Sequence, residues 1–310
     1  MFYHHALNFI MSLLSKHKYT LFGVLAILLW SSLTAFIRDL SELFSPIGGA
    51  ALMYSVSAIF LILVMGVPRL SNYPKRYLVF GGSLFVIYEM CLALSLGFAN
   101  SRQQALEMAI INYLWPALTI LFSIIVNRTK VSVLVYPSIL IAFLGVASCI
   151  AGNSGLSMAV LTANISDNPL PYSMAFAAAF IWAVYCSVTV KLSEGKNAIN
   201  VFFAATAISL WISYGLSNEP SFEFNVYSSF TLLLAGVVIG GGYALWNQAI
   251  IGGDLVFLGT LSYFIPVLST LFASIYLSLS LTNAFWQGVV LVTLGSLMCF
   301  IVTRKTKPAQ

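Results

Sequence analysis

Charged residues are scarce in this 310-residue chain: Lys, Arg, Asp and Glu together make up 7% of it, whereas hydrophobic residues make up 60%. Soluble globular proteins carry roughly 25% charged residues. A soluble fold could not bury this much apolar surface, so we infer that the lipid bilayer is the solvent for most of the chain. A spanning helix with a short loop takes about 30 residues, and the length therefore allows about ten spans.

Cysteine and histidine are also scarce, and their positions exclude two kinds of site. No spacing pairs a cysteine with a histidine or with another cysteine, and buried free cysteine packs as a small apolar residue. The sequence therefore indicates no disulfide framework, no metal site and no cofactor. The cysteines, all within apolar runs, are Cys91, Cys149, Cys186 and Cys299, and the histidines, all in the N-terminal segment, are His4, His5 and His17.

Motifs of ATP-driven and hydrolytic machinery are missing as well. The chain has no phosphate-binding glycine loop with its Lys, no HExxH motif and no convincing nucleophile elbow. We therefore expect a protein that is not an enzyme. An intramembrane hydrolase is the alternative from a different class.

Long apolar runs separated by short loops are what the chain has in abundance. They predict an all-α integral membrane protein with ten transmembrane helices. The expected ranges are 19–37, 47–66, 77–98, 104–126, 132–151, 172–190, 198–216, 227–249, 255–278 and 284–303.

Matching residues recur at a nearly constant spacing, which indicates an internal repeat. Trp30 and Trp182 lie 152 residues apart, and Pro116 and Pro266 lie 150 apart. Five spans per copy is an odd number, so the second copy enters the membrane upside down and the ten helices form two inverted five-helix repeats. The expected parts are a cytoplasmic N-terminal segment (1–18), the first repeat (19–151), a periplasmic connector (152–171), the second repeat (172–303) and a cytoplasmic tail (304–310).

The basic residues fall on one side of this topology. With a cytoplasmic N-terminus, 12 of the 14 Lys and Arg residues lie in inside segments, and only Arg38 and Arg102 lie outside. Cytoplasmic loops of membrane proteins carry such an excess. The net charge of +5 therefore reflects membrane topology, and we expect both termini in the cytoplasm and no nucleic-acid partner.

The most unusual stretch is Asn-Tyr-Leu-Trp-Pro (112–116), which is echoed as Ser-Tyr-Phe-Ile-Pro (262–266). Proline inside a helix removes one backbone hydrogen bond. In a bilayer, the freed backbone group needs protein or a water-filled cavity to satisfy it. Proline-interrupted spans at matching places in two halves point to a transporter's binding site, so we expect Pro116 and Pro266 to act as hinges that shape a cavity.

Polar and aromatic residues gather near the middle of six expected spans, three in each half. Residues three, four or seven apart share a helix face, so these spans would present mixed faces to a central cavity. The alternatives are small and polar residues that join helices and ordinary interior packing of the aromatic rings. The candidate substrate-binding residues are Trp30, Tyr88, Asn112, Trp115, Trp182, Tyr243, Trp246, Asn247 and Tyr263.

One acid, Glu89, falls near the middle of its expected span. An acid at this depth costs roughly 2.5–3.5 kcal/mol on insertion scales, which makes Glu89 a candidate proton or cation site. It could carry a proton, pair with a substrate ammonium, or be protonated and bonded to a neighbouring helix. Glu107 lies about one turn from the end of its span, and we expect a solvated or helix-start carboxylate there.

No Lys or Arg is expected at the depth of this cavity. Phosphates and nucleotide sugars need cationic partners, so the sequence disfavours them as substrates. Aromatic walls suit a planar apolar side chain and an ammonium group. A neutral or zwitterionic small molecule is therefore the expected cargo.

Several stretches resemble the drug/metabolite transporter superfamily in its EamA-type branch, and within that branch the bacterial exporters of aromatic amino acids. The resemblance covers roughly residues 18–303. Its specific stretches are Tyr-Glu-Met-Cys-Leu-Ala (88–93) and Asn-Tyr-Leu-Trp-Pro (112–116). Stretches that fit many members of the superfamily are Leu-Leu-Trp-Ser (28–31), Pro-Ile-Gly-Gly-Ala (46–50), Phe-Ile-Trp-Ala (180–183) and Phe-Trp-Gln-Gly (285–288).

The resemblance implies export of aromatic amino acids, with other neutral amino acids as further candidates. It also implies alternating access through a central cavity and the inner membrane of a Gram-negative bacterium. The alternative is an exporter of cationic or neutral drugs that uses Glu89; in either case we expect a monomer. The expected apolar walls are Trp30, Trp115 and Trp182, and the expected ligands of the amino-acid head group are Tyr88, Asn112 and Asn247.

Overall fold

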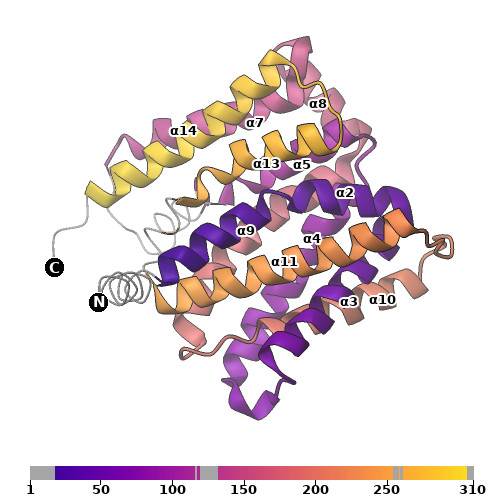
Figure 1. Ribbon diagram of the computed structural model, residues 1–310. Helices are drawn as coiled ribbons and strands as arrows, with labels where there is room; N and C mark the ends of the chain where they lie inside the picture. The colour runs from indigo at the N-terminus through magenta and orange to yellow at the C-terminus, as the bar shows by residue number, and fades with distance from the viewer. Residues whose placement is uncertain (1–17, 116, 119–131, 254–257, 259–260, 306–310) are drawn as a thin grey trace, which may run out of the picture.

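A computed structural model describes residues 18–115, 117–118, 132–253, 258 and 261–305 (Figure 1). All regular structure within these ranges is helical. The apolar runs become helices because, in lipid, a helix satisfies its own backbone hydrogen bonds. The helices are residues 18–30, α2 (Leu33–Phe44), α3 (Pro46–Met65), a π-helical turn (Tyr77–Gly81) leading into α4 (Gly82–Gly97), α5 (Arg102–Asn112), α7 (Val135–Ala151), α8 (Met158–Asp167), α9 (Pro169–Leu192), α10 (Ile199–Gly215), α11 (Val226–Gly252), α13 (Ile265–Tyr276) and α14 (Asn283–Lys305).

Seven helical spans within the described ranges are long and apolar enough to cross a membrane. α10, of 17 residues, and α13, of 12 residues, are apolar but shorter. The expected spans 104–126 and 255–278 both run into residues outside the described ranges. The structure thus supports seven of the ten expected spans directly: Lys18–Phe44, Pro46–Met65, Tyr77–Gly97, Val135–Ser154, Pro169–Leu192, Val226–Gly252 and Asn283–Val302.

The expected proline kink in the second half has a different form from the prediction. Phe264 N–H donates to Leu261 O (3.2 Å) in a tight turn, and α13 then begins at Ile265. Pro266 therefore lies in the first turn of a new helix, where its missing N–H would have no partner in any case. The prediction of a proline within a continuous helix is wrong for Pro266, and Pro116 lies outside the described residues.

The first half has a matching interruption before its proline. α5 ends at Asn112, and Leu114 N–H donates to Ile111 O (3.0 Å), which is again tighter than an α-helical turn. The helix predicted over 19–37 is also interrupted, at Ser31 and Ser32, and continues to Phe44. Serine hydroxyls that bond to the preceding turn bend helices in this way, and Ser31 Oγ donates to Ile27 O at 2.8 Å.

The expected connector at 152–171 contains a helix of its own. α8 begins after Ser157, whose hydroxyl caps it by accepting from Val160 N–H (3.2 Å). No residue of α8 is buried. Leu161 and Ile165 pack against the core but stay partly exposed. The apolar stretch of this ten-residue helix is too short to mark a span, so the sequence did not predict it.

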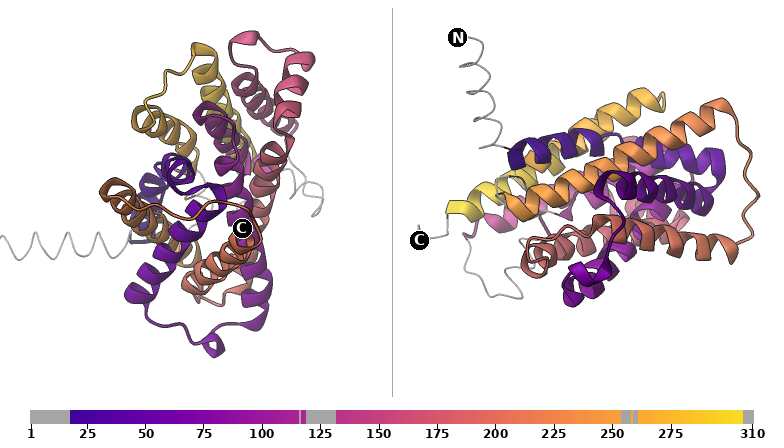
Figure 2. Two further views of the ribbon diagram at one scale, coloured as in Figure 1. Left: turned by 90° about the vertical axis from the view of Figure 1, so that its right-hand side faces the viewer. Right: turned by 60° about the horizontal axis from the view of Figure 1, so that its bottom comes forward.

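Helices at equivalent positions of the two repeats pack against each other. α7 lies along α14 at one edge of the molecule, and α3 lies along α10 at the opposite edge (Figures 1 and 2). Glycines allow the first pair to approach closely. A Cβ on Gly145 would lie 2.6 Å from Val292 N, and one on Gly295 would lie 2.5 Å from Ala142 N. The other helices lie between these two edges.

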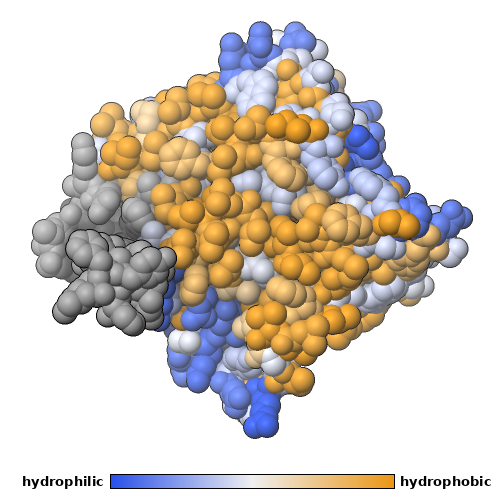
Figure 3. Space-filling model, viewed as in Figure 1, coloured by the Kyte–Doolittle hydropathy of each residue, from blue (hydrophilic) through white to orange (hydrophobic). Residues whose placement is uncertain are grey.

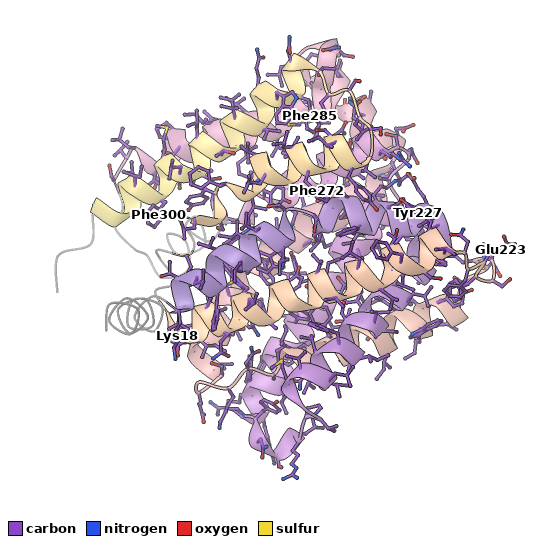
Figure 4. The ribbon with its side chains drawn as sticks, viewed as in Figure 1. Lys18, Glu223, Tyr227, Phe272, Phe285 and Phe300 are labelled. Atoms are coloured by element: carbon purple, nitrogen blue, oxygen red, sulfur yellow. The ribbon has the colours of Figure 1, made fainter. Side chains whose placement is uncertain are left out.

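The two ends of the bundle can be identified by labelled residues. Lys18 and Phe300 lie at one end, and Glu223 and Tyr227 lie at the other (Figure 4). We refer to these as the Lys18 end and the Glu223 end. α2 and α13 run toward the Glu223 end, whereas α5 and α11 begin there.

The surface between the ends is apolar. Orange, hydrophobic residues cover the broad middle of the face shown in Figure 3, and hydrophilic residues gather along the right-hand edge, at the top and at the bottom. Large side chains such as Leu63 and Val226 are among those exposed. A surface of this size and polarity fits contact with lipid.

Candidate functional site

A small cavity of about 30 Å³ lies in the middle of the bundle. It is formed where the broken first span, α4 and α5 of the first half meet α9, α11 and the start of α13 from the second half. A cavity of this volume holds one or two water molecules. The lining residues are Trp30, Leu33, Thr34, Tyr88, Leu92, Ala109, Asn112, Tyr113, Trp115, Trp182, Tyr243 and Ile265.

The aromatic side of the cavity is a packed cluster of rings from both halves. Tyr88 on α4 stacks on Trp182 of α9, with ring centroids 4.4 Å apart. Trp30 meets Trp182 edge to face at 5.8 Å and lies 4.9 Å from Tyr243 of α11. Offset stacking and edge-to-face contacts are the favourable geometries for aromatic pairs. The cluster thus forms a preorganised apolar wall that both repeats build.

The helix break and a glycine bring Trp30 into this position. Trp30 directly precedes the break at Ser31 and Ser32. On α11, Gly242 leaves room for the indole, since a Cβ there would lie only 3.1 Å from Trp30 Cδ1. A side chain at position 242 would therefore compete with the indole for space.

Two polar atoms at the cavity have no hydrogen-bond partner among the described residues. They are Asn112 Oδ1 and Trp30 Nε1, one acceptor and one donor, on side chains that are 5% and 7% exposed. Buried polar groups are usually paired. A third polar group, Thr34 Oγ1, lies 3.3 Å from Ser269 Oγ of α13. None of the lining residues carries a charge.

Six of the nine predicted binding residues line this cavity, namely Trp30, Tyr88, Asn112, Trp115, Trp182 and Tyr243. The other three lie elsewhere. Trp246 packs behind Trp30, with ring centroids 4.9 Å apart, and Tyr263 packs against Phe300 at 6.0 Å. The structure therefore does not bring Trp246 and Tyr263 to the cavity.

Asn247 is engaged in a separate polar network. Its Oδ1 accepts from Tyr185 OH (2.9 Å), and its Nδ2 donates to Asn197 Oδ1 (3.1 Å) and Tyr77 OH (3.5 Å). Tyr77 belongs to the first half and the other residues to the second, so the network ties the halves together near the Lys18 end. An amide held by these partners is not presented to the cavity, which differs from the expectation that Asn247 binds a head group.

Glu89 lies behind the cavity wall rather than in the lining. It is fully buried, and Tyr54 OH of α3 donates to its Oε2. Its Oε1 has no partner among the described residues. Of the three roles considered for Glu89, bonding to a neighbouring helix is the one that the geometry displays.

Glu107 is buried too, which overturns the expectation of a solvated carboxylate. It is 8% exposed, and its Oε2 accepts from Tyr172 OH of α9 at 2.5 Å. The prediction failed because the distance of a residue from the end of a span says nothing about the helix that covers it.

Several lining residues were not among the candidates. Leu33, Leu92, Ala109 and Ile265 are ordinary apolar residues that no sequence signal separates from the core. Tyr113 belongs to the unusual stretch at 112–116, three residues of which line the cavity: Asn112, Tyr113 and Trp115. The described residues contain no group of three or more His, Cys, Asp or Glu side chains placed to hold a metal ion.

Comparison with known proteins gives a consistent set of relatives. The EamA-like transporter family matches the chain twice, at residues 17–150 and 170–301. Aromatic amino acid exporter YddG of Salmonella typhimurium and its namesake of Escherichia coli K12 are each 44% identical over 292 residues, which cover 94% of this chain and 100% of each relative. A crystal structure of a protein 24% identical superposes with a TM-score of 0.67, covering 94% of this chain and 99% of the other.

Proposed function

The chain belongs to the EamA-like transporter family, and from this premise we propose that it exports aromatic amino acids, with other neutral amino acids as further candidates. The observation that supports this most strongly is the uncharged aromatic cavity, to which both repeats contribute. The relatives that match the chain over nearly its whole length are named aromatic amino acid exporters. A multi-pass membrane carrier in this family needs a site between its repeats, and the cavity lies in that place.

The lining offers complementary chemistry to a zwitterion with an aromatic side chain. Trp182, Tyr88 and Trp30 would stack on the side chain of the substrate. The free acceptor Asn112 Oδ1 suits an ammonium group, and the free donor Trp30 Nε1 suits a carboxylate. Trp115 would complete the apolar wall. Tyr243, whose ring lies beside Trp30, belongs to the same wall.

The cavity must expand to accept such a substrate. Its volume of about 30 Å³ is roughly a tenth of the smallest ordinary ligand pocket, about 300 Å³. Helices of the two halves must therefore part, as they do when one repeat of a carrier rocks against the other. The turns before Trp115 and Pro266 interrupt two of the lining helices and would be the flexible points, which keeps Pro116 and Pro266 as proposed hinge positions.

We assign the topology on the same basis. Ten spans in two inverted sets of five agree with the two family matches, which divide the chain at 151–169. The proposed parts are the repeats 19–151 and 172–303, with 152–171 as the periplasmic connector between them. Under this proposal the Lys18 end and both termini lie in the cytoplasm of a bacterium and the Glu223 end lies in the periplasm; the excess of Lys and Arg in the expected inside segments supports this orientation. The carrier acts as a monomer in the inner membrane under this proposal.

The alternative, an exporter of cationic or neutral drugs that uses Glu89, has less support. Glu89 does not line the cavity, and its carboxyl faces Tyr54 of α3. A cation in the cavity would meet aromatic faces but no carboxylate.

The site is tested by replacing one of its rings in purified protein in liposomes. We expect Trp182→Ala to reduce exchange of labelled phenylalanine at least tenfold, because the ring stacks at the centre of the cluster. Trp211→Ala is the matched control, since Trp211 lies on α10, is 38% exposed and is absent from the lining. Equal exchange by the two variants would show that the cavity is not the substrate site.

A further inference from the structure

Two basic residues depart from the charge distribution of the chain and reach the same carboxylate. Arg38 lies on α2, which runs toward the Glu223 end, and Arg102 is the first residue of α5, which begins there. In the expected topology both lie away from the other Lys and Arg. Arg38 Nε donates to Glu42 Oε1 (2.8 Å), and Arg102 Nη2 donates to Glu42 Oε2 (2.7 Å). Glu42 thus holds together two arginines from α2 and α5, both in the first half.

Three more hydrogen bonds join this point to the second half. Arg102 Nη1 donates to Leu277 O at the end of α13 (2.9 Å). Tyr227 OH of α11 and Tyr276 OH of α13 both donate to Asp39 Oδ2, at 2.9 and 2.8 Å. Asp39 is 6% exposed, and both of these donors come from the other half. We call this group the Glu42 cluster: Arg38, Asp39, Glu42, Arg102, Tyr227 and Tyr276.

The cluster lies over the cavity on the side of the Glu223 end. Asp39 follows the lining residue Thr34 by five residues of α2, a rise of about 8 Å, and Arg102 precedes the lining residue Ala109 by seven residues of α5, about 10 Å. α13 begins at the cavity with Ile265 and ends in the cluster with Tyr276. Figure 4 shows Tyr227 near the same end on α11. The cluster therefore ties together four of the helices that line the cavity, α2, α5, α11 and α13.

We propose that the Glu42 cluster is the gate of the carrier at the Glu223 end. Its bonds between the halves hold the cavity shut on that side and must break before a substrate can leave or enter there. This rests on the proposed function, because a gate presupposes a carrier whose halves move against each other.

The chemistry of the cluster suits a closure that opens repeatedly. When the halves part, water takes over the hydrogen bonds of Asp39, Glu42 and Arg102, so the net free energy of breaking each bond is small. The contact of α7 with α14 is of the opposite kind. There, glycines such as Gly145 and Gly288 bring the two backbones together. In lipid, water cannot replace the contacts that this pair would lose on separation. The close-packed edge is thus a fixed scaffold, and the polar end is the part that opens.

Thiol labelling tests the gate without any substrate. The four native cysteines are first replaced by alanine. Ala109→Cys then reports whether a membrane-impermeant thiol reagent reaches the cavity. Ser221→Cys, an exposed position near Glu223, shows whether the reagent is present on the Glu223 side. We expect Tyr227→Phe with Tyr276→Phe to raise the labelling rate from that side about tenfold, because Asp39 loses both donors. Glu223→Gln, an exposed acid at the same end, serves as the control and should leave the rate unchanged.

An unchanged labelling rate in the folded double variant would overturn the gate and make the cluster a static brace. Cross-linking covers the case in which that variant does not fold. Asp39→Cys joined to Tyr276→Cys by a short thiol cross-linker should reduce phenylalanine exchange to background, whereas a cross-link within the 216–225 loop, Ser217→Cys to Glu223→Cys, should not. Exchange that continues across the first cross-link contradicts the gate. Changed labelling without phenylalanine exchange would instead refute the proposed substrate and leave the gate standing.

Discussion

Two adjacent glycines of α11 allow a sharp test of the aromatic wall. A Cβ at Gly242 would lie 3.1 Å from Trp30 Cδ1 and 3.3 Å from Trp30 Nε1, so an alanine there requires the indole to shift by a few tenths of an ångström. A Cβ at Gly241 would lie 3.7 Å from Phe60 and 3.9 Å from Leu29, which is ordinary contact. The same substitution at neighbouring positions thus differs in its effect on Trp30.

The expected magnitude follows from how tightly Trp30 is held. Its ring lies 4.9 Å from both Tyr243 and Trp246 and 5.8 Å from Trp182, so the free space of the cavity is where the indole can move. Overpacking costs about 1–3 kcal/mol, and each 1.4 kcal/mol is a factor of ten in affinity. We therefore expect Gly242→Ala to weaken the binding of tryptophan roughly 5-fold to 150-fold.

Binding of labelled tryptophan to the purified protein in detergent, measured by scintillation proximity, gives the two dissociation constants directly. Gly241→Ala should stay within about twofold of the parent protein, because its new methyl group meets only ordinary contacts. Thermal unfolding of both variants separates a local effect on the site from a global loss of stability. If Gly242→Ala binds tryptophan as tightly as Gly241→Ala does, Trp30 does not form part of the substrate site.

Three further predictions concern the site and the frame that holds it. Asn112→Leu removes the free acceptor of the cavity and should weaken phenylalanine binding about tenfold while leaving the melting temperature within a few degrees; an unchanged affinity would remove Asn112 from the site. Gly288→Ala should lower the melting temperature by more than about 4 °C, because its Cβ would lie 2.7 Å from Gly145 O, whereas Gly215→Ala meets nothing within 4 Å and should not; a similar melting temperature for both would contradict the fixed α7–α14 edge. Glu219→Ala removes the carboxylate that accepts from the first N–H groups of α3 and should lower the free energy of unfolding by about 1–2 kcal/mol. Unchanged stability in denaturant would contradict this role of Glu219.

The central features of the site could be predicted from sequence because they depend on side-chain chemistry at mid-depth. Trp30 and Trp182, matched across the repeat, meet in the structure with ring centroids 5.8 Å apart. Tyr88 and Asn112 were predicted from the spacing of polar and aromatic residues along a helix face, and both line the same cavity. The sequence has no Lys or Arg at the expected depth of the cavity, and the lining of the cavity contains no charged residue.

The failures share a physical cause, which is that a sequence pattern does not fix where a helix restarts or which neighbour faces it. Pro266 lies in a first helical turn because the break falls at the preceding residues. Asn247 is held by Tyr77, a residue of the other half that no spacing connects to it. Glu107 is covered by Tyr172 for the same reason. Contacts between the repeats, including those of the Glu42 cluster, could be identified only from the structure.

Counterflow into proteoliposomes loaded with unlabelled amino acid tests the central claim most directly. Labelled tryptophan and phenylalanine should accumulate in vesicles with the parent protein and not in empty vesicles, since the aromatic cavity without a charged side chain accepts them. A labelled quaternary amine should not accumulate, because it has no N–H to donate to Asn112 Oδ1 and no carboxylate to accept from Trp30 Nε1. Accumulation of the amine without that of tryptophan or phenylalanine would contradict the proposal that this carrier exports aromatic amino acids.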